Sequence, residues 1–85
     1  MVNENIADWR KEIDAIDNEM MKLLVKRFEV TKKIRRHKKM NNLPVMDRGR
    51  EEHILQEKTG SSGLPRKFVK DFYKVIFEES RRIQR

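Results

Sequence analysis

Residues 5–41 read NIADWRKEIDAIDNEMMKLLVKRFEVTKKIRRHKKMN, a stretch without glycine or proline. Apolar side chains in it recur at alternating spacings of three and four, which is the period of one face of a helix. The pattern predicts a single helix over residues 5–41, with Asn5 as its N-cap. The apolar stripe consists of Ile6, Trp9, Ile13, Ile16, Met20, Leu23, Val30 and Ile34.

A helix of this length is too long for a small globule to cover. About 35 residues at roughly 1.5 Å each span on the order of 50 Å, whereas the whole chain has 85 residues. A chain this short buries only about 60% of its unfolded surface, so it is marginally stable alone. We therefore expect neighbouring chains to cover part of the helix.

Two cations occupy the stripe where apolar residues are expected. Arg27 fills one of its positions, and Lys38 follows eleven residues later, about 20° past three full turns, so both share one face with Ile34 between them. An isolated charge removed from water costs several kcal/mol unless it is paired. The pattern therefore predicts anionic company, either protein carboxylates or a ligand.

Local signals divide the rest of the chain. Residues 41–44, Asn-Asn-Leu-Pro, end the long helix, because asparagine tolerates a left-handed cap and proline disfavours helical backbone in the residue before it. Asp47 is a preferred N-cap for a second helix over residues 47–58. The Gly-Ser-Ser-Gly segment at 60–63 predicts a flexible loop, after which Pro65 suits the first turn of a third helix over residues 65–85.

The two shorter helices also place polar residues on their inward faces. In the second helix Ile54 and Leu55 face inward, with Glu51 one turn earlier on the same stripe. In the third helix an apolar stripe ends in two polar positions; its members are Val69, Phe72, Tyr73, Ile76, Ser80 and Gln84. All three helices thus contribute to a predicted polar pocket, whose residues are Arg27, Lys38, Glu51, Ser80 and Gln84.

The composition bounds the class of protein. With 36% hydrophobic and 41% charged residues and no strand pattern, residues 1–85 predict a single all-α domain of three helices. The chain has no cysteine, which excludes disulfides and thiolate metal sites. The start of the chain has no apolar core, so we expect neither a signal peptide nor a membrane span, and a cytoplasmic location. A net charge of +7 favours an anionic partner.

Short motifs at fixed spacing extend over nearly the whole chain. They are Arg10 followed by Ile13-Asp14-x-Ile16-Asp17, Leu23-Leu24-x-x-Arg27, Lys38, Pro44-Val45-x-Asp47-x-x-Arg50-Glu51 and Ser80-x-x-x-Gln84. Each motif alone is common, but the joint spacing is hard to obtain by chance. Together they resemble the all-α chorismate mutases of the AroQ type.

This resemblance implies an isomerase of the shikimate pathway of aromatic amino acid biosynthesis, which rearranges chorismate to prephenate. The reaction is a unimolecular pericyclic step without a covalent intermediate, and it requires no nucleophile, metal or cofactor. The flexible dicarboxylate must be held in its compact reactive conformer, and donors must meet the charge that develops on the breaking ether oxygen. The expected partners are chorismate and a second copy of the chain, with neither nucleic acid nor a membrane.

By this resemblance, the polar residues of the predicted pocket bind the dicarboxylate substrate. The implied catalytic residues are Lys38, Gln84, Arg27 and Glu51. The full set that the resemblance implies is Arg27 and Arg10 for carboxylates, Lys38 and Gln84 for the ether oxygen, Glu51 and Asp47 for the ring hydroxyl, Ser80 for a carboxylate, Arg50 as support and Ile34 as a wall for the ring.

Arg10 supplies a geometric argument for a dimer. It lies seventeen residues before Arg27, roughly 25 Å along one helix and about a quarter turn round it, so one small ligand cannot touch both in the same chain. If both serve one pocket, Arg10 must come from a second subunit whose long helix runs antiparallel. The intertwined helical homodimer of the family, with two shared sites, agrees with this prediction.

Some residues depart from the family or weaken an assignment. Arg35 and Arg36 stand where smaller or neutral residues are expected. Gly49 in the first turn of the second helix costs up to about 1 kcal/mol relative to alanine. Gln84 lies on the last predicted turn, where residues are poorly ordered unless they are tied down.

Taken singly, the site residues have plainer interpretations. Arg10 is more often a surface residue that pairs with Asp14, one turn away. Asp47 is more often only a helix cap, and Ser80 and Gln84 alone are ordinary polar residues at a helix end. The combination, not any single residue, favours a site.

Two other functions fit parts of the sequence. The basic run at residues 32–39 is typical of a module that binds nucleic acid or an acidic partner, but on a helix its charges spread round most of the cylinder and no aromatic residue lies among them. The second alternative is an isochorismate pyruvate lyase, an enzyme with a similar scaffold that would release pyruvate. Glu51 and Asp47, placed for the chorismate hydroxyl, disfavour that second alternative.

Overall fold

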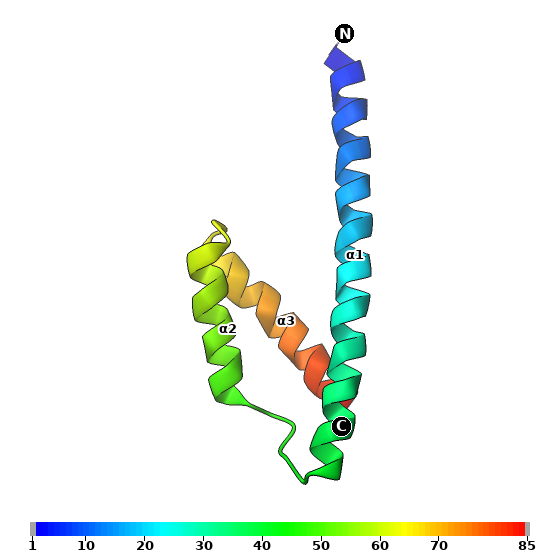
Figure 1. The fold of residues 1–85 in the computed structure, drawn as a ribbon. Helices are drawn as coiled ribbons and strands as arrows, with labels where there is room; N and C mark the ends of the chain where they lie inside the picture. The colour runs from blue at the N-terminus through cyan, green and yellow to red at the C-terminus, as the bar shows by residue number, and fades with distance from the viewer. Residues whose placement is uncertain (1, 85) are drawn as a thin grey trace. The chain divides into compact units, whose positions relative to one another are not determined.

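Three α-helices make up the described part of the chain. The computed structural model describes the backbone of residues 2–84 and the side chains of residues 5–84. Within this part the helices are α1 (Val2–Met40), α2 (Arg48–Ser61) and α3 (Arg66–Gln84), and there is no strand (Figure 1). The all-α prediction with three helices is confirmed. The predicted extension of the third helix to Arg85 falls outside the described residues.

The long helix α1 is continuous over 39 residues, as its sequence predicts. It begins at Val2, so Asn5 lies inside it with helical backbone. The prediction of Asn5 as the N-cap is therefore wrong, because an N-cap residue lies outside the helix. Neither α1 nor another described helix is apolar enough over sufficient length to cross a membrane.

A left-handed asparagine closes α1. Asn42 has φ 54°, the conformation predicted for this segment. The backbone N–H of Leu43 donates to the carbonyl of Lys38 over 2.8 Å, and that of Asn42 donates to Lys39 over 3.4 Å. This pair of bonds is the Schellman arrangement, which satisfies carbonyls that the helix end leaves unpaired. It turns the chain sharply just after Lys38, the last predicted site residue of α1.

Packing divides the chain into two units. One ends at Val30 and the other begins at Thr31. In the first unit the predicted apolar stripe is exposed within a single chain; its exposed members are Ile6, Trp9, Ile13, Ile16, Met20, Leu23 and Val30. A contiguous apolar stripe of this length, left uncovered by its own chain, is typical of a surface that another polypeptide covers.

In the second unit, α2 begins at the predicted cap but ends later than predicted. Asp47 has extended backbone (φ −126°, ψ 93°), and its side chain accepts from the backbone N–H of Arg50. The helix continues to Ser61, so Gly60 lies in its last turn and not in a loop. A glycine in a helix costs only about 1 kcal/mol, which packing can offset. The turn falls instead at Gly63, whose φ of 73° favours glycine.

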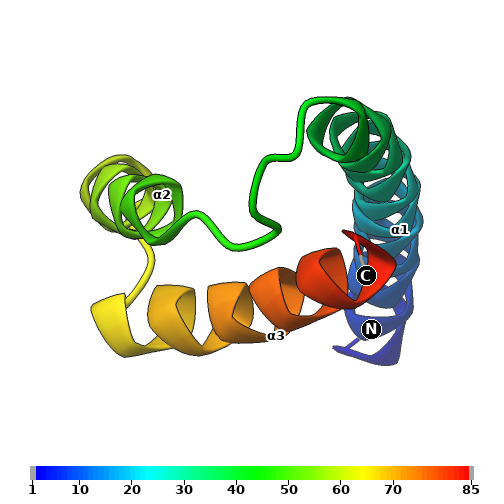
Figure 2. The same ribbon diagram turned by 90° about the horizontal axis from the view of Figure 1, so that it is seen from below.

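Helix α3 turns back from the end of α2, and the two helices diverge toward the C-terminal end of α3 (Figures 1 and 2). The buried apolar residues of this unit are Ile54 of α2 and Val69, Ile76 and Phe77 of α3. The prediction that Phe72 is buried is wrong, since it is 41% exposed. Phe77 is buried instead; it lies seven residues before the buried Gln84, only about 20° round the helix, on the covered side.

Candidate active site

The ammonium group of Lys38 joins three segments of the second unit. Its Nζ donates to the carbonyl of Val45 over 2.7 Å and to Oε1 of Gln84 over 2.9 Å. Lys38 is half-buried. A lysine ammonium has three N–H donors, so these two bonds leave a third donor for a ligand.

The amide of Gln84 is held in one orientation by this contact. A lysine ammonium can only donate, so the atom that faces it is the amide oxygen, and the amide nitrogen keeps both of its hydrogens for another acceptor. Gln84 is buried, with 9% of its surface exposed. The last turn of α3 is therefore tied to the end of α1 by this hydrogen bond. Such a contact is the condition under which a terminal turn is ordered.

A second polar contact links α2 to α3. Nη1 of Arg81 donates to Oε2 of Glu51 over 2.6 Å, and each side chain is only 22% exposed. The anionic residue at the inward position of α2 thus has a protein cation as its partner. Sequence reasoning did not select Arg81, although an inward carboxylate requires a cation and Arg81 directly follows the predicted site residue Ser80.

Ser80 is also buried, with 8% of its surface exposed. It lies one turn before Gln84, so the two polar positions that end the stripe of α3 share one face. Among the described side chains of α1, Thr31 is a buried polar residue, at 6% exposure. The candidate site in the second unit is thus formed by the end of α1 and the end of α3, with Glu51 contributed by α2.

Asp47 and Arg50 lie at the start of α2, and both are exposed. Oδ1 of Asp47 accepts from the backbone N–H of Arg50 over 3.0 Å. Asp47 therefore has the plainer role of a helix cap, which leaves its second carboxylate oxygen for a ligand. The side chain of Arg50 makes no part of this cap.

The remaining predicted residues lie along α1. Arg10 is exposed and Arg27 is half-buried. Ile34 is 45% exposed, so the prediction that it faces inward does not hold within one chain. The covered side of this part of α1 passes instead through Thr31, Arg35 and Lys38, because Ile34 lies about 60° round the helix from Thr31.

Arg35 carries a buried nitrogen without a hydrogen-bond partner among the described residues, its Nε. A buried donor left unpaired costs about 1–3 kcal/mol. Of the two arginines that depart from the residues expected in the family, Arg35 is half-buried and Arg36 is exposed.

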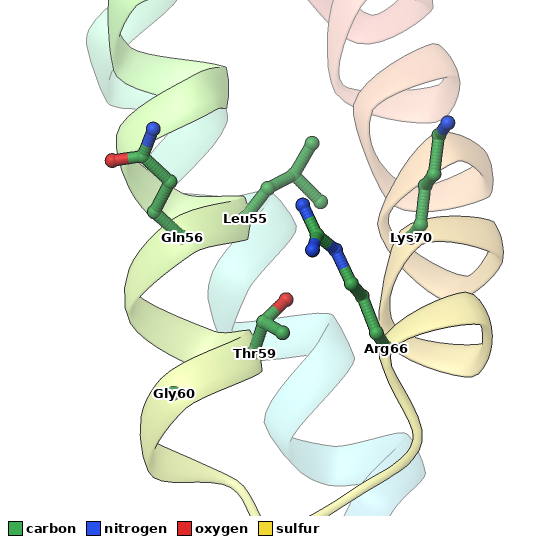
Figure 3. Close-up of a pocket in the computed structure, with 6 residues that line it drawn as sticks. All are labelled: Leu55, Gln56, Thr59, Gly60, Arg66 and Lys70. Carbon is green, nitrogen blue, oxygen red and sulfur yellow. The ribbon is translucent and has the colours of Figure 1, made fainter.

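A hollow of about 460 Å³ lies elsewhere, between α2 and α3 near the turn that joins them. Figure 3 shows Arg66 of α3 extending toward Leu55 of α2, with Thr59 facing the space between the helices. Its lining residues are Leu55, Gln56, Thr59, Gly60, Arg66 and Lys70. None of them is a predicted site residue, so we do not assign this hollow to the candidate active site.

Comparison with protein families matches residues 9–85 to the family described as chorismate mutase type II. These residues include every predicted site residue. No solved structure matches the chain.

Curated relatives show the same similarity. The T-protein of Haemophilus influenzae is 29% identical over 80 residues, covering 91% of this chain and 21% of that protein. A bifunctional chorismate mutase/prephenate dehydratase of Buchnera aphidicola subsp. Schizaphis graminum is 30% identical over 79 residues, with 89% and 20% coverage. A chorismate mutase of Methanocaldococcus jannaschii is 37% identical over 51 residues, covering 60% of this chain and 52% of that protein. The chain thus spans between a fifth and about half of the length of these relatives.

Proposed function

This chain belongs to the chorismate mutase type II family, and we propose that it rearranges chorismate to prephenate. The observation that supports the proposal is the 2.9 Å contact between Lys38 and Gln84, which lie 46 residues apart in the sequence. These are the two residues whose donors the resemblance assigns to the ether oxygen. Two residues that donate to the same oxygen atom must lie close together, and Lys38 and Gln84 are in contact.

In the proposed mechanism, the breaking ether oxygen accepts from both residues. Lys38 offers the N–H that Val45 and Gln84 do not engage, and Gln84 offers its amide N–H. Negative charge grows on this oxygen in the transition state, so hydrogen bonds to it strengthen as the reaction proceeds. A millionfold acceleration requires about 8 kcal/mol, which a few charge-assisted hydrogen bonds in a water-poor pocket supply.

The other residues hold the substrate in its reactive conformer. As the resemblance implies, Arg27 and Arg10 of a second subunit bind carboxylates, and Ser80 assists a carboxylate. Glu51 accepts a hydrogen bond from the ring hydroxyl. When both ends of the flexible dianion are held, the entropic cost of adopting the compact conformer is met on binding and no longer adds to the barrier of the chemical step.

The first experiment is a direct assay with the purified chain. We expect chorismate to disappear and prephenate to form, identified by mass spectrometry and by acid conversion of the product to an aromatic acid. Release of pyruvate would instead identify a lyase. Binding to nucleic acid that weakens steeply with salt, without any action on chorismate, would support the basic-module alternative.

We further propose that the enzyme is an intertwined homodimer in which the two long helices run antiparallel. The exposed apolar stripe of the first unit supports this, because Trp9, Ile16 and Leu23 are each more than half exposed in a single chain, at 59%, 58% and 60%. A second copy of α1 would cover such a stripe. It would also bring Arg10 of one subunit to the site of the other.

Mixing two inactive variants tests this shared site. Arg10→Ala is expected to lower kcat/KM by about 30-fold or more, because loss of one partner of a buried charge pair costs about 2 kcal/mol or more. When Arg10→Ala and Lys38→Ala chains are unfolded together and refolded, about half of the dimers are mixed. Each mixed dimer has one intact site out of two, so activity should return to about a quarter of the wild-type value.

The matched control refolds each variant alone, which should restore nothing. Native mass spectrometry establishes that mixed dimers have formed. Mixed dimers that stay inactive would place Arg10 and Lys38 in the same chain's site and contradict the antiparallel arrangement.

A further inference from the structure

We propose that Arg81 is a positioning residue that fixes the carboxylate of Glu51 for the ring hydroxyl of the substrate. The inference rests on the proposed function, since it concerns one contact of that reaction. Arg81 itself does not touch the substrate in this scheme; it acts through Glu51.

The geometry of the pair supports such a role. Nη1 of Arg81 and Oε2 of Glu51 lie 2.6 Å apart across two helices, and both side chains are 22% exposed. Other ion pairs of the described residues, such as Lys67–Asp71, join neighbours on one helix turn, and in that pair the side chains are 88% and 59% exposed. An exposed pair contributes little. A pair removed largely from solvent is less screened, so it holds its partners more firmly.

The ion pair uses only one of the two carboxylate oxygens of Glu51. Arg81 engages Oε2, and we assign the other oxygen, Oε1, to the ring hydroxyl. A glutamate has three rotatable side-chain bonds, and ordering such a side chain only when the ligand binds weakens binding. A guanidinium that directs its hydrogen bonds from a rigid plane removes much of this freedom in advance.

Arg81 lies between the two polar positions that end the stripe of α3. Ser80 precedes it, and Gln84 follows three residues later with its contact to Lys38. The same turn of α3 thus contacts both α1 and α2, at the end of this unit where both proposed substrate contacts meet. Arg81 fixes the hydroxyl contact relative to the ether-oxygen donors.

The test compares Arg81→Gln with Arg82→Gln. Arg82 is the adjacent residue with the same charge, but its Nε donates to Glu79 of the same helix over 3.0 Å, and both side chains are more exposed, at 68% and 38%. The hydrogen bond from Arg82 lowers the pKa of Glu79, so this control also removes a carboxylate partner. Both variants lose one positive charge from the last turn of α3.

We expect Arg81→Gln to raise KM for chorismate about 10- to 100-fold with kcat nearly unchanged, because the hydroxyl contact exists in both the bound substrate and the transition state. Arg82→Gln should stay within about twofold of wild type, and Arg81→Lys should recover part of the loss. In a Glu51→Gln background, Arg81→Gln should have little further effect, because the residue through which it acts is already changed.

Other outcomes overturn the inference. A fall in kcat with KM unchanged would mean that the substitution disturbs Gln84 and the end of α3. A full effect of Arg81→Gln in the Glu51→Gln background would show that Arg81 acts through another group. Circular dichroism and urea unfolding check that each variant is folded. If the wild-type chain fails to convert chorismate, the proposed function fails. If the wild-type chain is active and Arg81→Gln has the same kinetics, only the positioning role fails.

Discussion

Replacing Lys38 by alanine is expected to lower kcat for prephenate formation by about 100- to 1,000-fold, the usual effect of removing one donor from a site that stabilises a developing oxyanion. The substitution removes the donor to the ether oxygen and also frees the amide of Gln84, whose oxygen Lys38 holds at 2.9 Å. The second consequence adds to the first, because a rotated amide presents an acceptor to an oxygen that needs a donor. Steady-state kinetics with chorismate measure the effect.

Lys39→Ala is the matched control for this prediction. Lys39 is the next residue of α1 and is exposed, so it changes the charge of the same helix end without touching the site. Its variant should keep wild-type kinetics. Turnover that survives in Lys38→Ala would remove Lys38 from the mechanism and with it the observation on which the proposed function rests.

Replacing Gln84 by glutamate is expected to make the activity depend on acid. A free glutamic acid titrates near pH 4.3, and the ammonium of Lys38 beside it favours the ionised form. At pH 7–8 the carboxylate only accepts hydrogen bonds, so the donor to the ether oxygen is lost and kcat should fall about 100-fold. As the pH falls through the pKa of the new carboxyl group, its O–H becomes a donor and activity should rise toward the wild-type value.

The amide of the wild-type Gln84 does not titrate, so its donation should not require acid. Gln84→Leu serves as the control, because it removes the donor without adding an ionisable group, and its low activity should not recover at acid pH. The prediction is tested by measuring kcat from about pH 3 to about pH 8, so that the range extends below as well as above the pKa of the new carboxyl group. A Gln84→Glu variant whose profile parallels that of wild type would show that residue 84 does not donate to the reacting oxygen.

The sequence predicted the features that depend on near neighbours in the chain. The continuity of α1 follows from a stretch without glycine or proline, and its end follows from Asn42, which takes a left-handed conformation as expected. Asp47 caps α2 because its side chain reaches a backbone N–H only three residues away. The inward positions of Ser80 and Gln84 follow from a period of about 3.6 residues, and both are buried.

Periodicity was less reliable where the covered side of a helix is narrow. It placed Phe72 inside and omitted Phe77, whereas Phe77 is 7% exposed and Phe72 is 41% exposed. It also placed Ile34 on the inward face of α1, where this residue is 45% exposed within one chain. One helical period tolerates an error of about one residue in the direction of its face, and only the contact with another helix fixes that direction.

Sequence alone therefore determined the family motifs, the presence of three helices, the caps at Asn42 and Asp47, and the residue types of the proposed dicarboxylate site. Only the tertiary structure decided that Arg81 is the partner of Glu51 and that the amide oxygen of Gln84 faces Lys38. These contacts join residues 30 and 46 positions apart. Their geometry depends on how helix ends meet after two turns of the chain, which no local spacing encodes because a small change in a turn moves a helix end by several ångströms.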